Sequence, residues 1–218
     1  MKKIVSVFSL SLIGVLAATA GIGVFAEYSK AQSSTQFSID LQAFRDAALA
    51  KHNEYRALHD APPLQFDSGL NASAQAYAEE LAKKSEGLSA GSPYFKHSTN
   101  RSEVGENLSY QATTSEIPSA LAIAEKAVKD WYIEVNDYDF NNPGKQKLGS
   151  EKKQIGHFTQ VVWKKTSKIG CGVATATVNF SSKTGTGMFT VCQYSSPGNV
   201  MLDGGYTLYE QNVVPANR

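Results

Sequence analysis

The chain has 218 residues and a formal net charge of +1, from 21 basic and 20 acidic residues interspersed along the sequence. This balance argues against nucleic-acid binding, which requires a concentrated basic surface. After the N-terminal segment about 180 residues remain, which is enough for one domain with a substantial core.

The N-terminus has the pattern of an export signal, because Met-Lys-Lys precedes a predominantly apolar run from Ile4 to Ala26. We predict a signal peptide over residues 1–26 and a secreted, extracellular protein. The small-residue runs at 18–20 and 24–26 are alternative cleavage sites. A bilayer is spanned by ~20 apolar residues, so an uncleaved membrane anchor is the alternative to a signal peptide. Residues 27–38 are polar and aperiodic, which indicates a linker, and residues 39–218 form the predicted domain.

Two amphipathic helices are predicted next along the chain. The first runs from Asp40 to about His59 and is ended by Pro62-Pro63, since neither proline donates a helix hydrogen bond. Its apolar face carries Leu41, Phe44, Ala48, His52 and Tyr55. Ser68 is the expected N-cap of the second helix, after an extended connector over 63–67. The buried stripe of this second helix carries Leu70, Ala74, Tyr77, Ala78 and Leu81.

A third helix is predicted after a loop over 87–94 and a polar interval. It begins at Ser115 or Pro118 and continues to about Asp137, with Ile123, Ala127, Trp131 and Val135 spaced by four residues. Glu134 therefore lies beside the apolar stripe and not on the solvent face. Residues 141–144 (NNPG) have the composition of a turn, and residues 145–153 that of a polar loop.

The C-terminal part predicts a short helix followed by two strands. His157 opens the helix, and Ile169, Cys171 and Val173 then alternate with small residues, as in a strand. The run 188–199 is the expected partner strand. If the two strands pair antiparallel around a loop near 179–184, Cys171 and Cys192 lie opposite each other and form a disulfide in an oxidising compartment. The alternative is two free buried thiols. Helices followed mostly by strands predict an α+β layered fold.

Four Asn-x-Ser sequons become glycosylation sites if the chain follows a eukaryotic secretory route. They lie at Asn71, Asn100, Asn107 and Asn179.

Several segments together resemble the CAP superfamily of cysteine-rich secretory proteins, venom antigens and plant pathogenesis-related proteins. The matching segments are HNEYR (52–56), His97-Ser98, GEN (105–107), WYIEV (131–135), GHFTQVVWKKTSKIGCG (156–172) and VCQYSSPGN (191–199). The resemblance implies a three-layer α-β-α sandwich with a small, mainly antiparallel central sheet. The chain departs from many extracellular members in having cysteines for one disulfide only. It also has Ser196 where many relatives have proline.

The resemblance also implies a cleft that gathers His97, Glu106, Glu134 and His157 from four separated segments. Two imidazoles and two carboxylates offer donors suited to zinc or a similar divalent ion, with His97 and His157 as the metal ligands. Without a metal, each carboxylate accepts a hydrogen bond from an imidazole and fixes its tautomer. A purely structural His/Glu network is therefore the competing interpretation, since buried charges must be paired.

Three functions follow as hypotheses. In the first, a secreted CAP domain binds a small apolar ligand, such as a sterol or fatty acid, or a cell-surface partner. In the second, a zinc-dependent hydrolase or peptidase uses the same cleft, with Glu106 or Glu134 as base, although the chain lacks an H-E-x-x-H helix. In the third, the domain is an extracellular scaffolding module. His52, Asn53 and Arg56 are interpreted as packing and capping groups. His59 is expected to end the first helix as a partly charged imidazole.

Overall fold

The computed structural model describes residues 39–99, 103–145, 154–202 and 204–217, which fall within one compact unit, Phe37–Arg218. The predicted signal peptide over 1–26, the linker over 27–38 and the sequon at Asn100 lie outside the described residues. Among the helices of the described part, none is long and apolar enough to cross a membrane.

The predicted helices are present, with differences at their ends. Helix α1 (Leu41–Leu58) is capped by the Asp40 side chain, which accepts hydrogen bonds from two backbone N–H groups. Helix α2 (Ser68–Ser85) is capped by Asp67, so the prediction of Ser68 as its cap is wrong by one residue. Both residue types cap helices well, and the Asp67 carboxylate is the one that accepts from Leu70.

The third helix starts later than predicted and changes its winding before it ends. Helix α3 (Ala120–Tyr132) begins after its N-cap Ser119, two to five residues beyond the expected start. It continues as the 3-10 turn η1 (Ile133–Asp137), which carries Glu134. The short helix α4 (Gly156–Val162) opens next to His157 as predicted, and α5 (Thr207–Asn212) was not predicted.

The strands form one four-stranded sheet in the order β1-β3-β4-β2. The short edge strand β1 (Gln65–Phe66) is parallel to β3 (Lys168–Asn179). The other two pairings, of β4 (Thr184–Ser195) with β3 and with β2 (Gly105–Thr113), are antiparallel. The sheet is therefore mainly antiparallel, and the loop between β3 and β4 lies where it was predicted.

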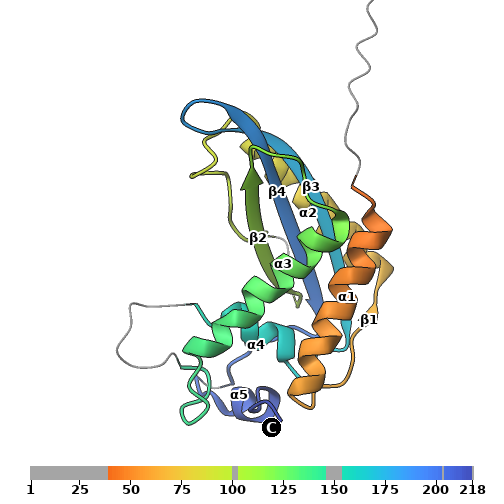
Figure 1. Ribbon diagram of the computed structural model, residues 1–218. Helices are drawn as coiled ribbons and strands as arrows, with labels where there is room; N and C mark the ends of the chain where they lie inside the picture. The colour runs from red at the N-terminus through yellow and green to blue at the C-terminus, as the bar shows by residue number, and fades with distance from the viewer. Residues whose placement is uncertain (1–38, 100–102, 146–153, 203, 218) are drawn as a thin grey trace, which may run out of the picture. The chain divides into compact units, whose positions relative to one another are not determined.

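Helices cover both faces of this sheet, which confirms the α+β sandwich of three layers. Helix α2 packs on one face, and α1 and α3 lie together on the other (Figure 1). A buried cluster fills each interface: Leu81, Phe189 and Val191 are central under α2, whereas Phe44 and Ile123 belong to the larger cluster under α1 and α3.

Glycines on β3 explain how closely α2 approaches the sheet. A Cβ atom on Gly172 would lie 2.3 Å from the Cα atom of Gln75, and one on Gly170 would lie 2.1 Å from the backbone nitrogen of Asn71. Both contacts are with the helix backbone, so no side chain can be accommodated there. The alternation of glycine with Ile169 and Cys171 thus marks the strand face on which a helix rests.

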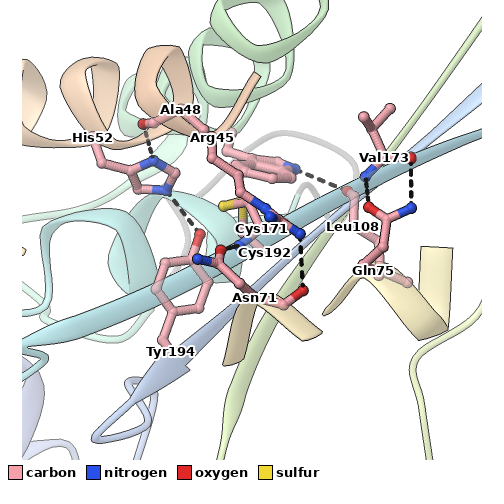
Figure 2. Close-up of a disulfide and its surroundings, with 11 residues drawn as sticks. Arg45, Ala48, His52, Asn71, Gln75, Leu108, Cys171, Val173, Cys192 and Tyr194 are labelled. Carbon is pink, nitrogen blue, oxygen red and sulfur yellow. Dashed lines mark hydrogen bonds between the residues drawn. A yellow bond between two sulfur atoms is a disulfide. The ribbon is translucent and has the colours of Figure 1, made fainter. Parts of the chain in front are cut away.

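The side chains of α2 also complete the hydrogen bonding of β3 beyond the end of β1. The Asn71 amide oxygen accepts from the backbone N–H of Cys171 at 2.9 Å, and the Gln75 amide pairs with both backbone groups of Val173 (Figure 2). The Arg45 guanidinium of α1 donates to the Cys171 carbonyl at 3.0 Å. These contacts satisfy backbone groups that an open sheet edge would leave unpaired.

The predicted disulfide joins Cys171 to Cys192, which stand opposite each other in the β3–β4 register. The two Cα atoms are 4.2 Å apart, and both residues are buried at the centre of the sheet (Figure 2). With a sequence separation of 21 between the two cysteines, the chain-entropy model gives a stabilisation of about 3 kcal/mol. The bond also fixes the register of the two longest strands.

The histidine within α1, His52, and the one that follows its last residue, His59, are both fully buried. His52 bonds to the Ala48 carbonyl and the Tyr194 hydroxyl, at 2.7 and 2.9 Å, in agreement with a packing role (Figure 2). His59 ends the helix as predicted, but the expected partial charge is wrong because burial lowers the pKa of its imidazole. Its two ring nitrogens contact the Val214 carbonyl and the Tyr132 hydroxyl.

Candidate functional site

A cavity of about 690 Å³ lies where β2, the start of α4 and the segment after β4 meet. His97, Glu106 and His157 all line this cavity, which we call the cleft. Glu134 is not among the lining residues, but it contacts His157 from η1. The four residues that the resemblance grouped together are thus two His–Glu pairs, and both imidazoles face one hollow.

The first pair joins the segment after α2 to strand β2. The Glu106 side chain is fully buried, and one of its oxygens accepts from His97 Nδ1 at 2.8 Å and from the Ser98 N–H at 3.0 Å. The other oxygen accepts from Ser98 Oγ at 2.9 Å and from Gln193 Nε2 at 3.1 Å. Burial alone would raise the pKa of Glu106, but hydrogen bonds from His97, Gln193 and Ser98 outweigh it and lower the pKa.

The second pair joins η1 to the first turn of α4. One oxygen of Glu134 accepts from His157 Nδ1 at 2.7 Å. The other accepts from the backbone N–H groups of His157 and Phe158 at 2.9 and 3.2 Å. Glu134 therefore supplies the N-terminal cap that α4 lacks in its own sequence, and a carboxylate is favoured at this end of a helix.

Both pairs leave the same imidazole nitrogen for the cleft. Because each Nδ1 donates to a carboxylate, the neutral imidazole carries its hydrogen there and has a lone pair on Nε2. Neither His97 Nε2 nor His157 Nε2 makes a hydrogen bond to another described residue. The His97 side chain is 44% exposed and that of His157 is 21% exposed, so both remain accessible.

The cleft has few other groups with chemical reactivity. Within the described ranges, no three His, Cys, Asp or Glu side chains are close enough together to hold a metal ion by themselves. The hydroxyls next to the histidines in sequence face other groups. The Ser98 hydroxyl donates to Glu106, and that of Thr159 contacts Asn199 Oδ1 and the backbone carbonyls of Ile155 and Gly156. No hydroxyl–imidazole pair of the kind that activates a nucleophile is present among these contacts.

Two polar residues of the cleft were not assigned a role from the sequence. Gln160 is almost fully buried, and its side-chain oxygen accepts from the Gly198 N–H at 2.8 Å. Asn199 has a positive φ of 59° and donates to the Gly156 carbonyl, which ties the segment after β4 to α4. Both lie inside the motifs quoted above, but motif membership alone does not indicate which side chains face a cavity.

The sequons differ strongly in their surroundings. Asn107 is only 1% exposed and its amide donates to the His157 carbonyl at 3.2 Å, which argues against a glycan on this residue in the folded domain. Asn71 is partly exposed, and Asn179 is exposed next to the Gly87 carbonyl.

The fold and the paired His/Glu cleft define a class of α-β-α sandwich domains with two cleft histidines, and similarity to known proteins identifies the family. The model of the cysteine-rich secretory protein (CAP) family matches residues 49–194. The chain belongs to the CAP family.

Individual relatives agree with this assignment. The human Golgi-associated plant pathogenesis-related protein 1 is 35% identical over 180 residues, which cover 80% of this chain and 95% of that protein. Protein PRY2 of Saccharomyces cerevisiae is 31% identical over 79% of this chain, which spans only 41% of the yeast protein. The crystal structure of NaASP2 with Zn²⁺ superimposes with a TM-score of 0.54 and 26% identity, covering 78% of this chain and 86% of NaASP2.

Proposed function

We propose that this CAP domain is a secreted binding protein whose cleft takes a small apolar ligand, such as a sterol or a fatty acid. A divalent metal ion, held by Nε2 of His97 and of His157, would form part of the same site. The observation that carries the proposal is that one cavity of about 690 Å³ is lined by both imidazoles. A cell-surface protein partner is the other binding function that such a cleft could serve.

The cleft has the size and lining of a small-molecule site. Such sites occupy roughly 300–1,000 Å³ and combine apolar walls with a few polar groups. The polar lining consists of the two imidazoles together with Lys96, Glu106, Asn107, Gln154, Gln160 and Asn199. The apolar lining comes from Phe95, Val104, Leu108, Ile155 and Pro197. A hydroxyl head group would donate to Nε2 of an imidazole, and a carboxylate head group would bind the metal ion, while the hydrocarbon part covers these walls.

The two imidazoles also fit a metal ion. Neutral Nε2 is the atom with which histidine binds zinc, and a carboxylate on the opposite nitrogen orients the ring and increases its basicity. Glu106 and Glu134 are in that position. With two protein ligands, the other coordination positions would be filled by water or by the bound molecule. The crystal structure of NaASP2 with Zn²⁺ shows that a protein of this fold accommodates zinc.

The carboxylates favour binding over zinc-dependent hydrolysis or peptidase activity. A general base needs a carboxylate oxygen that can reach water or substrate. Glu106 accepts four hydrogen bonds and its side chain is fully buried, while Glu134 accepts three and does not line the cleft. Both are therefore engaged in holding the histidines and the start of α4.

Labelled sterol and labelled fatty acid, each titrated with the full chain, test the ligand. We expect saturable binding of one of them at one molecule per chain. Val104→Glu, which introduces a charge on the cleft wall, should weaken it about tenfold or more, because a charge next to a hydrocarbon ligand is not compensated. Leu121→Glu, at an exposed position of α3 outside the cleft, is the matched control and should bind normally.

The control for this experiment is circular dichroism of both variants, which should give the spectrum of the wild-type chain. The absence of saturable binding for both ligands, or equal weakening by the two variants, would eliminate the apolar ligand.

A further inference from the structure

A second hollow of about 330 Å³ adjoins the cleft. Helix α2, residues 94–99 and Gln193 of β4 line it, and we call it the lysine pocket. Lys96 and His97 line both the cleft and the lysine pocket, so the two hollows share a wall. The cleft residues discussed above do not explain the charges in this second hollow.

Two ammonium groups meet at one aromatic ring in the lysine pocket. Nζ of Lys84 lies 4.7 Å from the centre of the Tyr94 ring, and Nζ of Lys96 lies 4.9 Å from it. Lys84 comes from the last turn of α2, whereas Lys96 lies in the segment after that helix. Like charges held at one ring repel each other, and a bound anion would relieve this repulsion.

The carboxylates nearby do not neutralise both lysines. Glu80, one turn before Lys84 on α2, bonds to Nζ of Lys84 at 2.5 Å. Lys96 has no ion pair with any carboxylate of the described residues. Glu106 lies behind Ser98 and Gln193, two lining residues of the lysine pocket that donate hydrogen bonds to it. Within the described residues, Lys96 is therefore left without a bonded carboxylate, while the buried Glu106 offsets part of the positive charge of the pocket.

The remaining donors suit an oxyanion. Lysine ammonium groups present three donors each and bind phosphate as point charges. The hydroxyls of Ser73 and Thr99 also line the pocket, at exposed positions. The floor is rigid, since Tyr77 donates its hydroxyl to the Lys96 carbonyl at 2.5 Å and fixes the backbone that carries that lysine. The Tyr94 ring positions both ammonium groups by cation–π contacts.

We propose that the lysine pocket binds the phosphate group of a phosphate ester, through Lys84 and Lys96. The organic part of the ester would extend past the shared wall at Lys96 and His97 toward the cleft. Neither Lys84 nor Lys96 is among the groups proposed above to hold the metal ion, so this site does not depend on that proposal. A phosphate ester of this kind is either a free metabolite or the head group of a lipid.

Two probes carry the same glycerol phosphate group and distinguish these sources. Glycerol 3-phosphate is titrated by calorimetry, and vesicles of phosphatidylcholine with and without phosphatidic acid are tested by co-sedimentation. All measurements use the full chain with a chelator present, so that metal in the cleft cannot bind phosphate. Saturation by glycerol 3-phosphate would identify the ligand as a free phosphate ester. Binding only to the vesicles that contain phosphatidic acid would identify it as a lipid. Either result supports the lysine pocket if the variants below agree.

Charge variants assign the binding to the pocket. Lys84→Gln and Lys96→Gln should each weaken binding about fivefold, as expected for one lysine at an anionic group. Lys83→Gln makes the same charge change on the next residue of α2, outside the pocket, and should change the affinity less than twofold. Glu80→Gln removes the carboxylate that competes for Lys84 and should tighten binding.

No binding of either probe would overturn the proposal. It would equally fail if Lys83→Gln weakened binding as much as Lys96→Gln, because the attraction would then be general surface charge.

Discussion

Replacement of Arg56 by methionine should lower the free energy of unfolding by about 3–5 kcal/mol, as expected when buried polar groups lose a charged partner. Arg56 lies on α1 and its side chain is completely buried. It has no carboxylate partner in the part of the chain that the structure describes, but it donates to four backbone carbonyls at 2.8–2.9 Å, those of Pro62, Val161, Trp163 and Thr166. Methionine would fill much of the space but leave these carbonyls without a donor.

The size of this effect follows from what Arg56 holds together. Its four partners belong to the turn after α1, the end of α4 and the loop before β3. Burial lowers the pKa of Arg56 to about 10, so the group remains charged at neutral pH. A cation is also favourable at the C-terminal end of α4, where carbonyls lack partners in the helix.

Urea unfolding followed by circular dichroism measures the loss. Arg45→Met is the matched control, since Arg45 is partly buried and its guanidinium donates to the carbonyls of Cys171 and Asn71. We expect it to cost about 1 kcal/mol. A loss for Arg56→Met no larger than for Arg45→Met would show that the carbonyls find other donors.

Acidification should destabilise the domain through His52, by about 3 kcal/mol between pH 7 and pH 4. The pKa of His52 is lowered from 6.5 to about 4, mainly by burial. The hydrogen bond to the Ala48 carbonyl raises this pKa, and the nearby charge of Arg56 lowers it. Below about pH 6.5 the unfolded chain takes up a proton at this residue while the folded chain does not. Stability is therefore lost as the pH falls from about 6.5 to about 4.

Urea unfolding at several pH values, for the wild type and His52→Gln, isolates this contribution. Over this range the free energy of unfolding should depend less steeply on pH in the variant. The difference in slope should correspond to about one proton, because glutamine does not titrate. The pKa of His59 is lowered in the same direction and its contribution remains in the variant. Glu106, whose pKa is lowered, contributes stability that is lost only below the usual pKa of 4.5. Identical pH dependence in both proteins would contradict the assignment to His52.

Helices and strands whose apolar residues recur at a regular spacing could be predicted from the sequence, and those without such a spacing could not. The apolar stripes of α1 and α2 and the alternation around Cys171 led to the correct helices and to the disulfide. Strand β2 was missed because its first five residues, Gly105–Ser109, are all buried and so show no apolar–polar alternation. Its polar residues are satisfied by specific partners, such as the His157 carbonyl, which accepts from the Asn107 amide. Those partners come from elsewhere in the chain.

The site could be predicted only through the family resemblance. His97 and Glu106 are nine residues apart, and Glu134 and His157 are separated by 23, which shows no regular spacing. Their pairing depends on where β2, η1 and α4 come together in the fold. The resemblance named the four residues together, but it did not separate them into two pairs or show that Glu134 lies outside the cleft lining and caps α4. The convergence of Lys84 and Lys96 on Tyr94 likewise has no signal in the sequence.

Zinc titration by calorimetry tests most directly whether the two imidazoles serve one site. We expect the full chain to bind one zinc ion, and His97→Ala and His157→Ala each to weaken binding by about tenfold or more. Glu134→Gln, which alters the group that orients His157, should weaken it as well, whereas His52→Gln should not. Full zinc affinity in both alanine variants, with the domain folded, would contradict a shared site.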